Sequence, residues 1–300
     1  MSTPRRASLR ARLIAALLAA TGVKRVAYAP GRFLAGRPRR LPAADDPVPR
    51  LPHGVVVERW PGEPVATLIP TVTSGRPPVV YLHGGAHAAP VRRAHWVYAA
   101  RLALALGAPV TLPRYPLAPE STVHESLAML EGVVRRVAAD GGFVLVGDSA
   151  GAGKALALVT SRAVRPLALV LNSPFVDART GARSGSAAER RDPLLVAAHL
   201  EVLARAYAAH AGVDDPLVSP IDAPLADLPP TAIFTGTRDL LHEDAVELRR
   251  RFEEAGVDAW LSTHHEMIHD WMLLPIPEAG RQIAETVSFV DSVRDGGSGP

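Results

Sequence analysis

The feature that most limits how this chain can fold is a regular alternation of short apolar runs and longer helical segments after residue 77. The apolar runs have the length of buried strands and lie at residues 78–82, 109–113, 143–146, 167–171, 231–235 and 260–263. The helical segments lie at residues 92–106, 121–139, 150–162, 241–255 and 278–293. Alternation of this kind predicts an α/β fold, with a mostly parallel central sheet and helices on both faces.

Two more strands are expected before this alternation begins. Residues 55–59 and 65–70 have the pattern of a hairpin, with Pro61-Gly62 at its turn. A serine at the start of the 121–139 segment predicts an N-cap at Ser121. Ligand sites in mostly parallel sheets lie at the carboxyl ends of the strands, so the loops there are the places to look for chemistry.

The strongest local motif is Gly147-Asp148-Ser149-Ala150-Gly151. It follows a predicted strand and opens a predicted helix, which is the context that the G-x-S-x-G pattern requires. The sharp turn would expose the hydroxyl of Ser149, and the N-terminus of the helix would place N–H groups near a developing oxyanion. We therefore predict that Ser149 is a nucleophile; a structural glycine-rich turn is the alternative.

A phosphate-binding loop is excluded at the same place. Gly153-Lys154 looks suggestive, but the G-x-x-x-x-G-K-[ST] pattern needs a glycine where Asp148 stands. It also needs a serine or threonine where Ala155 stands. Both departures remove the reason to expect a nucleotide.

A second motif, His83-Gly84-Gly85-Ala86, ends the 78–82 strand. Glycines let the backbone approach a substrate closely, so this loop is expected to direct N–H groups at an oxyanion. The predicted donors are Gly84, Gly85 or Ala86, together with Ala150; a tight turn without such a role is the alternative. Alanine still donates its N–H, and the site is expected to survive if the φ angle of Ala86 stays negative.

The acid and the base should follow the serine in that order along the chain. Asp239 comes just after the 231–235 strand, whereas its main rival, Asp244, falls inside the next helix. His269 lies in the loop after the 260–263 strand and is the predicted base; His264 and His265 lie closer to that strand and are the rivals. Asp239 would orient the imidazole, and activity should fall as His269 protonates, at about pH 6–7.

Composition excludes several other classes. The chain has no cysteine, which rules out disulfides, thiolate metal sites and a cysteine nucleophile. Its net charge is only +3, without the clustered basic and aromatic residues typical of nucleic-acid binding. The close histidines at 264, 265 and 269 with Asp270 have no second cluster to complete a metal site, so we predict none.

The first 30 residues allow more than one interpretation. Arg5, Arg6, Arg10 and Arg12 precede an apolar run that is short for a membrane span. Five apolar side chains fall on one helical face: Leu9, Leu13, Ile14, Leu17 and Leu18. We predict that this face packs on the protein, that membrane contact is unlikely and that the protein is cytoplasmic. A targeting segment that exports the chain, or contact with a membrane surface, are the alternatives.

Taken together, the motifs resemble those of the hormone-sensitive-lipase-like esterases, the bacterial carboxylesterases with an HGGG loop and a GDSAG elbow. Further matching segments are Tyr115-Pro116-Leu117-Ala118-Pro119-Glu120, Asp192-Pro193-Leu194-Leu195 and Asp215-Pro216-Leu217-Val218-Ser219-Pro220. The resemblance covers about residues 75–292. Ala86, His87 and Pro116 depart from the family pattern and leave the substrate and the rate open.

The resemblance implies an α/β-hydrolase fold. Residues 1–45 and 175–215 would form a helical cap over a catalytic domain made of residues 46–174 and 216–300. It also implies no metal or organic cofactor, a small-molecule ester substrate and a possible homodimer through an edge strand.

The expected function is that of a serine carboxylesterase acting on short- to medium-chain acyl esters. A deacetylase, lactonase or amidase on the same fold remains open, as do a membrane-bound lipase and a non-catalytic ligand receptor.

Overall fold

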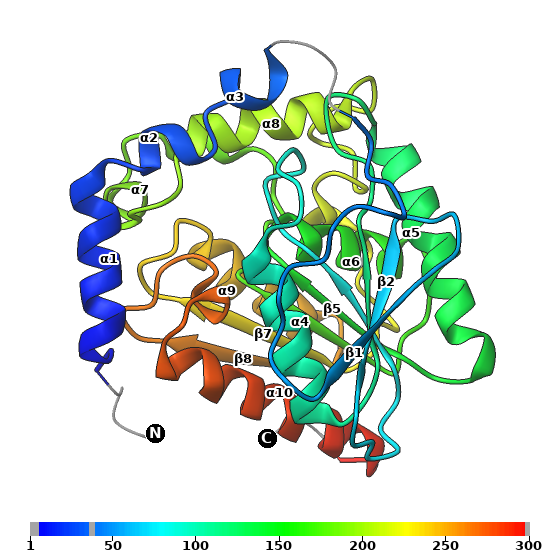
Figure 1. Ribbon diagram of the computed structural model, residues 1–300. Helices are drawn as coiled ribbons and strands as arrows, with labels where there is room; N and C mark the ends of the chain where they lie inside the picture. The colour runs from blue at the N-terminus through cyan, green and yellow to red at the C-terminus, as the bar shows by residue number, and fades with distance from the viewer. Residues whose placement is uncertain (1–5, 36–39, 298–300) are drawn as a thin grey trace.

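The computed structural model describes residues 6–35 and 40–297, which build one eight-stranded sheet in the order β1-β2-β4-β3-β5-β6-β7-β8 (Figure 1). The strands are β1 (Val55–Arg59), β2 (Val65–Pro70), β3 (Val79–Leu82), β4 (Val110–Pro113), β5 (Val144–Asp148), β6 (Ala168–Asn172), β7 (Thr231–Gly236) and β8 (Ala259–His264). β1 and β2 are antiparallel to their neighbours, and all pairs from β4 to β8 are parallel. The predicted fold class and the predicted hairpin are both confirmed.

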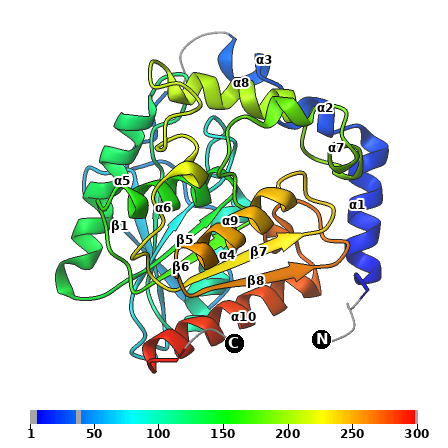
Figure 2. The ribbon, with the colours of Figure 1, turned by 180° about the vertical axis from the view of Figure 1, so that it is seen from behind.

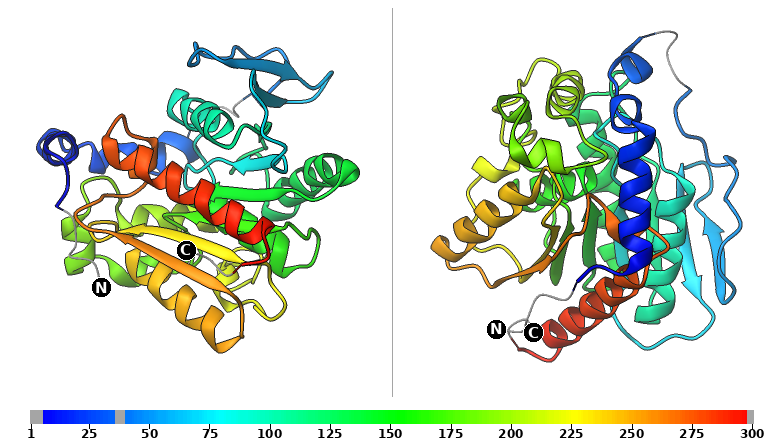
Figure 3. Two further views of the ribbon diagram at one scale, coloured as in Figure 1. Left: turned by 90° about the horizontal axis from the view of Figure 1, so that it is seen from below. Right: turned by 90° about the vertical axis from the view of Figure 1, so that its left-hand side faces the viewer.

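Helices cover both faces of the sheet (Figures 1 and 3). One face packs against α4 (Arg93–Leu106) and α10 (Pro277–Arg294). The other packs against α5 (Val123–Val137), α6 (Ala150–Thr160) and α9 (His242–Glu254). The described connections contain four short 3₁₀ segments: η1 (Ala138–Asp140), η2 (Thr180–Arg183), η3 (Pro220–Asp222) and η4 (Trp271–Leu273).

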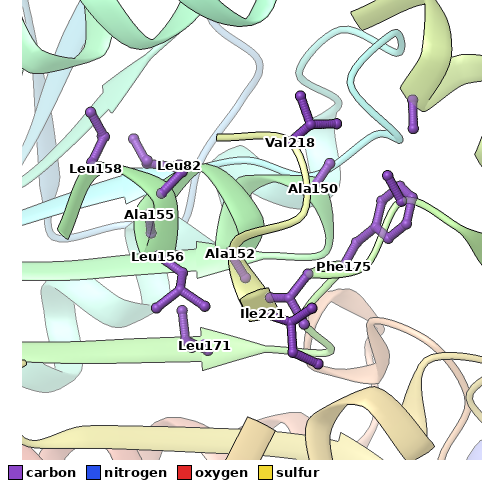
Figure 4. Packing of buried hydrophobic residues seen from close by; sticks show 14 of the residues in the cluster. Leu82, Ala150, Ala152, Ala155, Leu156, Leu158, Leu171, Phe175, Val218 and Ile221 are labelled. Atoms are coloured by element: carbon purple, nitrogen blue, oxygen red, sulfur yellow. The ribbon is translucent and has the colours of Figure 1, made fainter. Parts of the chain in front are cut away.

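The sheet divides the apolar core into two layers because successive strand residues point to opposite faces. On β3, Val79 and Tyr81 belong to the layer beneath α4 and α10. Val80 and Leu82 belong to the layer around α6, where Leu82 lies near Ala155 and Leu171 lies near Leu156 (Figure 4). Both faces of β3 are apolar and fully buried, as expected of a central parallel strand.

The start of α5 differs from the prediction by one residue. Thr122, not Ser121, is the N-cap, and its hydroxyl accepts a hydrogen bond from the backbone N–H of Glu125. The carboxylate of Glu125 accepts the N–H of Thr122 in return at 2.8 Å. This reciprocal pair is a capping box, which needs a glutamate three residues after the cap. Ser121 donates its hydroxyl to the same carboxylate.

The N-terminal segment lies beside the insertion after β6, although the two are far apart in sequence. The segment contains α1 (Leu9–Thr21), α2 (Lys24–Ala27) and α3 (Gly31–Leu34). The insertion contains α7 (Ala187–Arg191) and α8 (Ala197–Ala208). Figures 1 and 2 show α2 next to α7 and α3 next to α8. The ammonium group of Lys24 joins the two by donating to the carbonyl oxygens of Glu189 and Asp192.

The prediction that the apolar face of α1 packs on the protein holds only in part, because Ile14 packs against the core and Leu18 is half-buried. Leu9, Leu13 and Leu17 are exposed, whereas Ala11 and Ala15 are buried. The rotation of the helix is set at its start, where Ser8 donates its N–H and hydroxyl to the carboxylate of Glu278. The small alanine side chains then allow close approach on the inner face.

No single described helix is long and apolar enough to cross a membrane. The pair Leu9–Thr21 and Lys24–Leu34 passes the same test of length and composition only when taken together, across a bend of 70°.

Candidate active site

Ser149 occupies a strained turn between β5 and α6. Its φ of 49° lies in the left-handed region, which a residue with a side chain rarely adopts. Three backbone hydrogen bonds hold it there: its N–H donates to Asn172 O at 2.9 Å, and its carbonyl accepts from Phe175 N at 3.0 Å and from Gly153 N at 3.2 Å. The turn therefore has the form that the G-x-S-x-G motif predicts.

The two glycines of the motif are required by close backbone contacts. A Cβ on Gly151 would lie 2.1 Å from the carbonyl oxygen of Leu82, and a Cβ on Gly147 would lie 2.6 Å from Ala152 N. Helix α6 thus starts directly against the end of β3, so that the serine turn and the His83–Ala86 loop lie side by side. This contact explains why the motif tolerates no side chain at these positions.

The structure brings Ser149, Asp239 and His269 together in a series of hydrogen bonds. Asp239 follows β7, and His269 lies in the loop after β8. Asp239 Oδ2 lies 2.9 Å from His269 Nδ1, and His269 Nε2 lies 2.9 Å from Ser149 Oγ. All three side chains are buried. This is the order and geometry expected of a nucleophile, its base and the group that orients the base.

The rival residues have other partners. Asp244 lies within α9 and forms an ion pair with the guanidinium of Arg183, with a distance of 2.6 Å from Nη1 to Oδ2. His264 Nε2 is 3.1 Å from Ser262 Oγ and 3.4 Å from the Glu285 carboxylate. His265 is exposed.

An extra carboxyl group lies against the imidazole. Asp270 Oδ2 is 3.3 Å from His269 Nε2, and Asp270 Oδ1 is buried without a hydrogen-bond partner among the described residues. Burial opposes protonation of the imidazole, but the carboxylates of Asp239 and Asp270 outweigh it and raise the pKa of His269 well above its ordinary value. Burial also raises the pKa of Asp270. The loss of activity expected at about pH 6–7 should therefore occur at a higher pH.

Among the predicted oxyanion donors, Gly84 differs from the others because its N–H is already hydrogen-bonded. Its N–H already donates to Asp148 Oδ2 at 2.9 Å. In the described part of the chain, the N–H groups of Gly85, Ala86 and Ala150 donate to no protein acceptor. These three groups remain free to bind an oxyanion, and the inclusion of Gly84 among the donors is corrected.

Ala86 does not meet the condition of a negative φ under which the oxyanion site was expected to survive. Its φ is 50°, that of His87 is 62° and that of Gly85 is 126°. A left-handed residue with a side chain costs roughly 1–2 kcal/mol, so the loop needs compensating contacts. The N–H groups of Ala88 and Ala89 provide two by donating to the Gly85 carbonyl, the latter at 2.7 Å.

Asp148, a residue without an assigned role in the sequence analysis, connects the two motifs. It is fully buried, and its carboxyl group accepts hydrogen bonds from Tyr81 Oη and Gly84 N. His95 Nε2 lies 3.7 Å away. Burial and the nearby Asp270 raise the pKa of Asp148 well above its ordinary value. Its position in the G-x-S-x-G pattern does not reveal this connection, because the pattern leaves that residue unspecified.

A buried lysine is the second residue that the sequence analysis missed. Lys154 on α6 is 1% exposed, and Lys154 Nζ lies 2.8 Å from His87 Nδ1. The ammonium also lies 3.5 Å from the ring centroid of Tyr207, which stacks on His87 at 4.1 Å. Burial lowers the pKa of Lys154 well below its ordinary value. A single lysine within the apolar 150–160 helix was the available sequence signal.

No group of three or more histidine, aspartate or glutamate side chains within residues 6–35 and 40–297 is arranged to hold a metal ion.

A serine, a histidine and an aspartate in series at the carboxyl edge of this sheet define the class of serine hydrolases with an α/β-hydrolase fold. Comparisons with known proteins agree. A family model described as the alpha/beta hydrolase fold matches residues 79–273. An acetyl-hydrolase of Streptomyces hygroscopicus is 33% identical over 218 residues, which are 69% of this chain and 72% of the relative.

Two further relatives extend this match. A triacylglycerol lipase of Mycobacterium tuberculosis is 32% identical over 65% of this chain, but this region is only 42% of the lipase. A crystal structure of an esterase from the bacterial hormone-sensitive lipase family aligns with a TM-score of 0.79 at 26% identity, covering 95% of this chain and 98% of the other. The chain belongs to the hormone-sensitive-lipase-like carboxylesterases of the α/β-hydrolase fold, and it is a serine carboxylesterase.

Proposed function

We propose that the protein hydrolyses small esters with short- to medium-chain acyl groups, with Ser149 as nucleophile, His269 as general base and Asp239 as its orienting acid. The observation that carries the proposal is the unbroken series of hydrogen bonds from Asp239 through His269 to Ser149 Oγ. Both links measure 2.9 Å, so the imidazole can take the hydroxyl proton without moving.

The reaction proceeds by acyl transfer. Neutral His269 accepts the proton of Ser149 as Oγ attacks the ester carbonyl carbon. The imidazolium then protonates the alkoxy oxygen, the C–O bond breaks and the alcohol leaves, while the acyl group stays on Ser149. Water gives a proton to His269 and attacks the acyl-enzyme, and the imidazolium returns the proton to Ser149 as the acid departs.

The N–H groups of Gly85, Ala86 and Ala150 would stabilise the charge that forms on the carbonyl oxygen. Ala150 is the first residue of α6, so the positive end of that helix adds to the stabilisation. A donor of this kind is worth about 10²–10³ in kcat. Asp148 keeps the loop beside the helix through its bond to Gly84 N.

Two features support a short acyl chain. His87 directly follows the proposed donor Ala86, and its ring stacks on Tyr207 and lies 5.4 Å from the ring of Phe175. These three buried rings pack together, and we expect them to leave little room beside the oxyanion loop for a long acyl chain. In addition, two relatives at 33% and 31% identity are named acetyl-hydrolases.

The same names favour a second candidate function, the removal of an acetyl group from one particular metabolite. The chemistry at Ser149 would be unchanged, and only the alcohol side of the substrate would be restricted. A panel of acetylated alcohols and sugars would then show one substrate with a kcat/KM far above that of simple acetate esters.

We also propose that the N-terminal segment and the 175–215 insertion together form the cap. Tyr207 of α8 in the insertion contacts His87 of the oxyanion loop, and Lys24 ties α2 to α7. Residues 1–5 and 36–39 of the proposed cap lie outside the described residues. Partial proteolysis that removes only α1–α3 should change the order of ester preference.

Hydrolysis of p-nitrophenyl esters from acetate to palmitate tests the main proposal. We expect turnover to peak at short or medium chains and to disappear in Ser149→Ala. A peak at palmitate would contradict the acyl-chain assignment. Labelling by a fluorophosphonate probe supplies an independent test: wild type should be labelled on Ser149, and absence of labelling in folded protein would contradict the nucleophile assignment.

A further inference from the structure

Helix α1 presents an apolar stripe to solvent. Leu9, Leu13 and Leu17 are 65%, 60% and 62% exposed. They are spaced four residues apart, so they form one line along the outer face of the helix. Ala16 and Ala20 lie on the same face and are exposed as well. Figures 1 and 2 show α1 at the edge of the molecule.

Two arginines border this stripe. Successive helical residues are separated by about 100°, so Arg10 lies just beyond the edge marked by Leu17, and Arg12 lies beyond the edge marked by Ala16. Both arginines are exposed, and neither forms an ion pair within the described part of the chain. An apolar stripe with a basic residue on each side is the pattern of helices that lie in a lipid–water interface, because long cationic side chains reach the headgroups while the apolar face enters the acyl region.

A basic groove begins where the stripe ends. Ala20 belongs to the stripe and also lines a cavity of about 440 Å³ between α2, α7 and the loop after β7. Five cationic side chains line this groove: Lys24, Arg25, Arg190, Arg191 and Arg238. No carboxylate within the described residues forms an ion pair with any of the five. Asp192 also lines the groove, but its oxygens accept backbone N–H groups of Leu195 and Leu240.

The charges of this region favour an anionic partner over a second copy of the chain. No aspartate or glutamate precedes Asp45 in the sequence, whereas basic residues recur throughout that stretch. Two copies that met through α1 would bring like charges together around the leucines. An anionic lipid surface matches both the apolar stripe and the basic groove. The leucines can enter the acyl region, and the guanidinium and ammonium groups can bind the lipid phosphate groups.

We propose that α1 lies flat on an anionic lipid surface, with Leu9, Leu13 and Leu17 in the acyl boundary and with lipid phosphate groups in the basic groove formed by Lys24, Arg25, Arg190, Arg191 and Arg238. None of Ser149, His269 and Asp239 lines the groove, so the proposed docking contacts involve no member of the catalytic series. The inference does not depend on the proposed acyl-chain preference.

Flotation of the full-length protein with lipid vesicles tests the proposal. Intact mass first establishes that α1 is retained in the sample. With about 30 mol% phosphatidylglycerol in phosphatidylcholine, we expect the protein to float with the vesicles and to dissociate as salt is raised. With phosphatidylcholine alone, binding should be at least about tenfold weaker. Equal binding to both vesicle types, or no binding to either, would overturn the proposal.

Two double variants test the apolar stripe and the basic groove separately. Leu13→Glu with Leu17→Glu should abolish flotation, and Arg25→Gln with Arg191→Gln should weaken it by at least about tenfold and flatten its salt dependence. Val72→Glu is the matched control for the leucine variant, because Val72 is also exposed but lies on the β2–β3 connection. The urea midpoint of each variant should match that of wild type, which shows that each variant is folded. Undiminished flotation of the leucine variant would contradict the proposal.

Two further results would reassign the surface. If sedimentation velocity shows a dimer that Leu13→Glu with Leu17→Glu dissociates, and vesicles do not bind, the stripe is an interface between copies. If free glycerol 3-phosphate binds in the groove as tightly as vesicles do, the groove is a site for a small anion. Either outcome would overturn the lipid assignment.

Discussion

The catalytic edge of the sheet buries charged residues, whereas helix α1 exposes apolar ones. At the catalytic edge, Asp148, Asp270 and Lys154 are withdrawn from water, and all three shift their pKa towards the neutral form because burial opposes charge. On α1, leucines face solvent and arginines surround them. Burying charge and exposing apolar surface both reduce stability, so we interpret each region as selected for what it contacts rather than for the stability of the fold.

The largest loss of activity is expected when the nucleophile is removed. Ser149→Ala should lower kcat on the order of 10⁵-fold or more, because binding and the oxyanion donors alone supply little of the catalysis. The unfolding free energy should change little. Steady-state hydrolysis of p-nitrophenyl acetate with urea unfolding in parallel measures both. A variant that keeps turnover within tenfold of wild type would show that another residue is the nucleophile.

The close packing of the serine turn is tested by a matched pair of glycine substitutions. Gly151→Ala places a Cβ 2.1 Å from Leu82 O and should lower the free energy of unfolding by about 3 kcal/mol or more, since neither backbone can move freely. Gly132 lies on the exposed face of α5 with nothing within 4 Å of a Cβ. Gly132→Ala should therefore stabilise the protein by about 0.5–1 kcal/mol. Equal urea midpoints for the two variants would contradict the structure at this turn.

The buried lysine offers a variant in which stability and activity move in opposite directions. Lys154→Met removes a buried amine that has no carboxylate partner among the described residues and should raise the free energy of unfolding by about 1–2 kcal/mol. It also removes the bond to His87 Nδ1, next to the donor Ala86, and should lower kcat about tenfold.

His87→Phe tests whether the two residues act together. Because Lys154 and His87 share one bond, the double variant should lose little more activity than either single variant. Additive losses in a double-mutant cycle would show that the lysine and the histidine act separately.

A smaller effect concerns the pH dependence of catalysis. His269 must be neutral to act as a base, and its raised pKa places the acidic limb of kcat/KM above the usual range for histidine. Asp270→Asn removes one of the carboxylates that stabilise the imidazolium, so the pKa of His269 should fall and the acidic limb should move to lower pH. Activity on the acid side should rise a few-fold. Asp295→Asn, at the exposed end of α10, is the control, and identical pH profiles for the two variants would refute this role of Asp270.

The smallest change in stability is expected for a substitution in the exposed stripe of α1. Leu13→Ser should change the free energy of unfolding by less than about 0.5 kcal/mol, because the side chain is already in water. Leu82→Ala, in the core on β3, should cost about 2–5 kcal/mol. A large destabilisation by Leu13→Ser in urea unfolding would mean that α1 packs through its leucines after all.

The sequence by itself determined the class of fold and the residues of the hydrogen-bonded series. Strand and helix periodicities are local, and they placed the strands within a residue or two of their positions in the structure. Ser149, Asp239 and His269 were identifiable because each follows a strand whose carboxyl end must lie at the same edge of a parallel sheet. The same reasoning separated Asp239 from Asp244, which a helix directs elsewhere.

Only the tertiary structure decided which side chains and backbone groups contact one another at that edge. It showed that Gly84 N is occupied by Asp148, that Ala86 adopts a positive φ and that Lys154 is buried against His87. These contacts join segments distant in sequence, so no local pattern records them. The face of α1 that is turned towards the protein is likewise set by a contact between segments distant in sequence. A helix that is apolar on two faces can pack through either one, and the bonds between Ser8 and Glu278, 270 residues apart, select the alanine face.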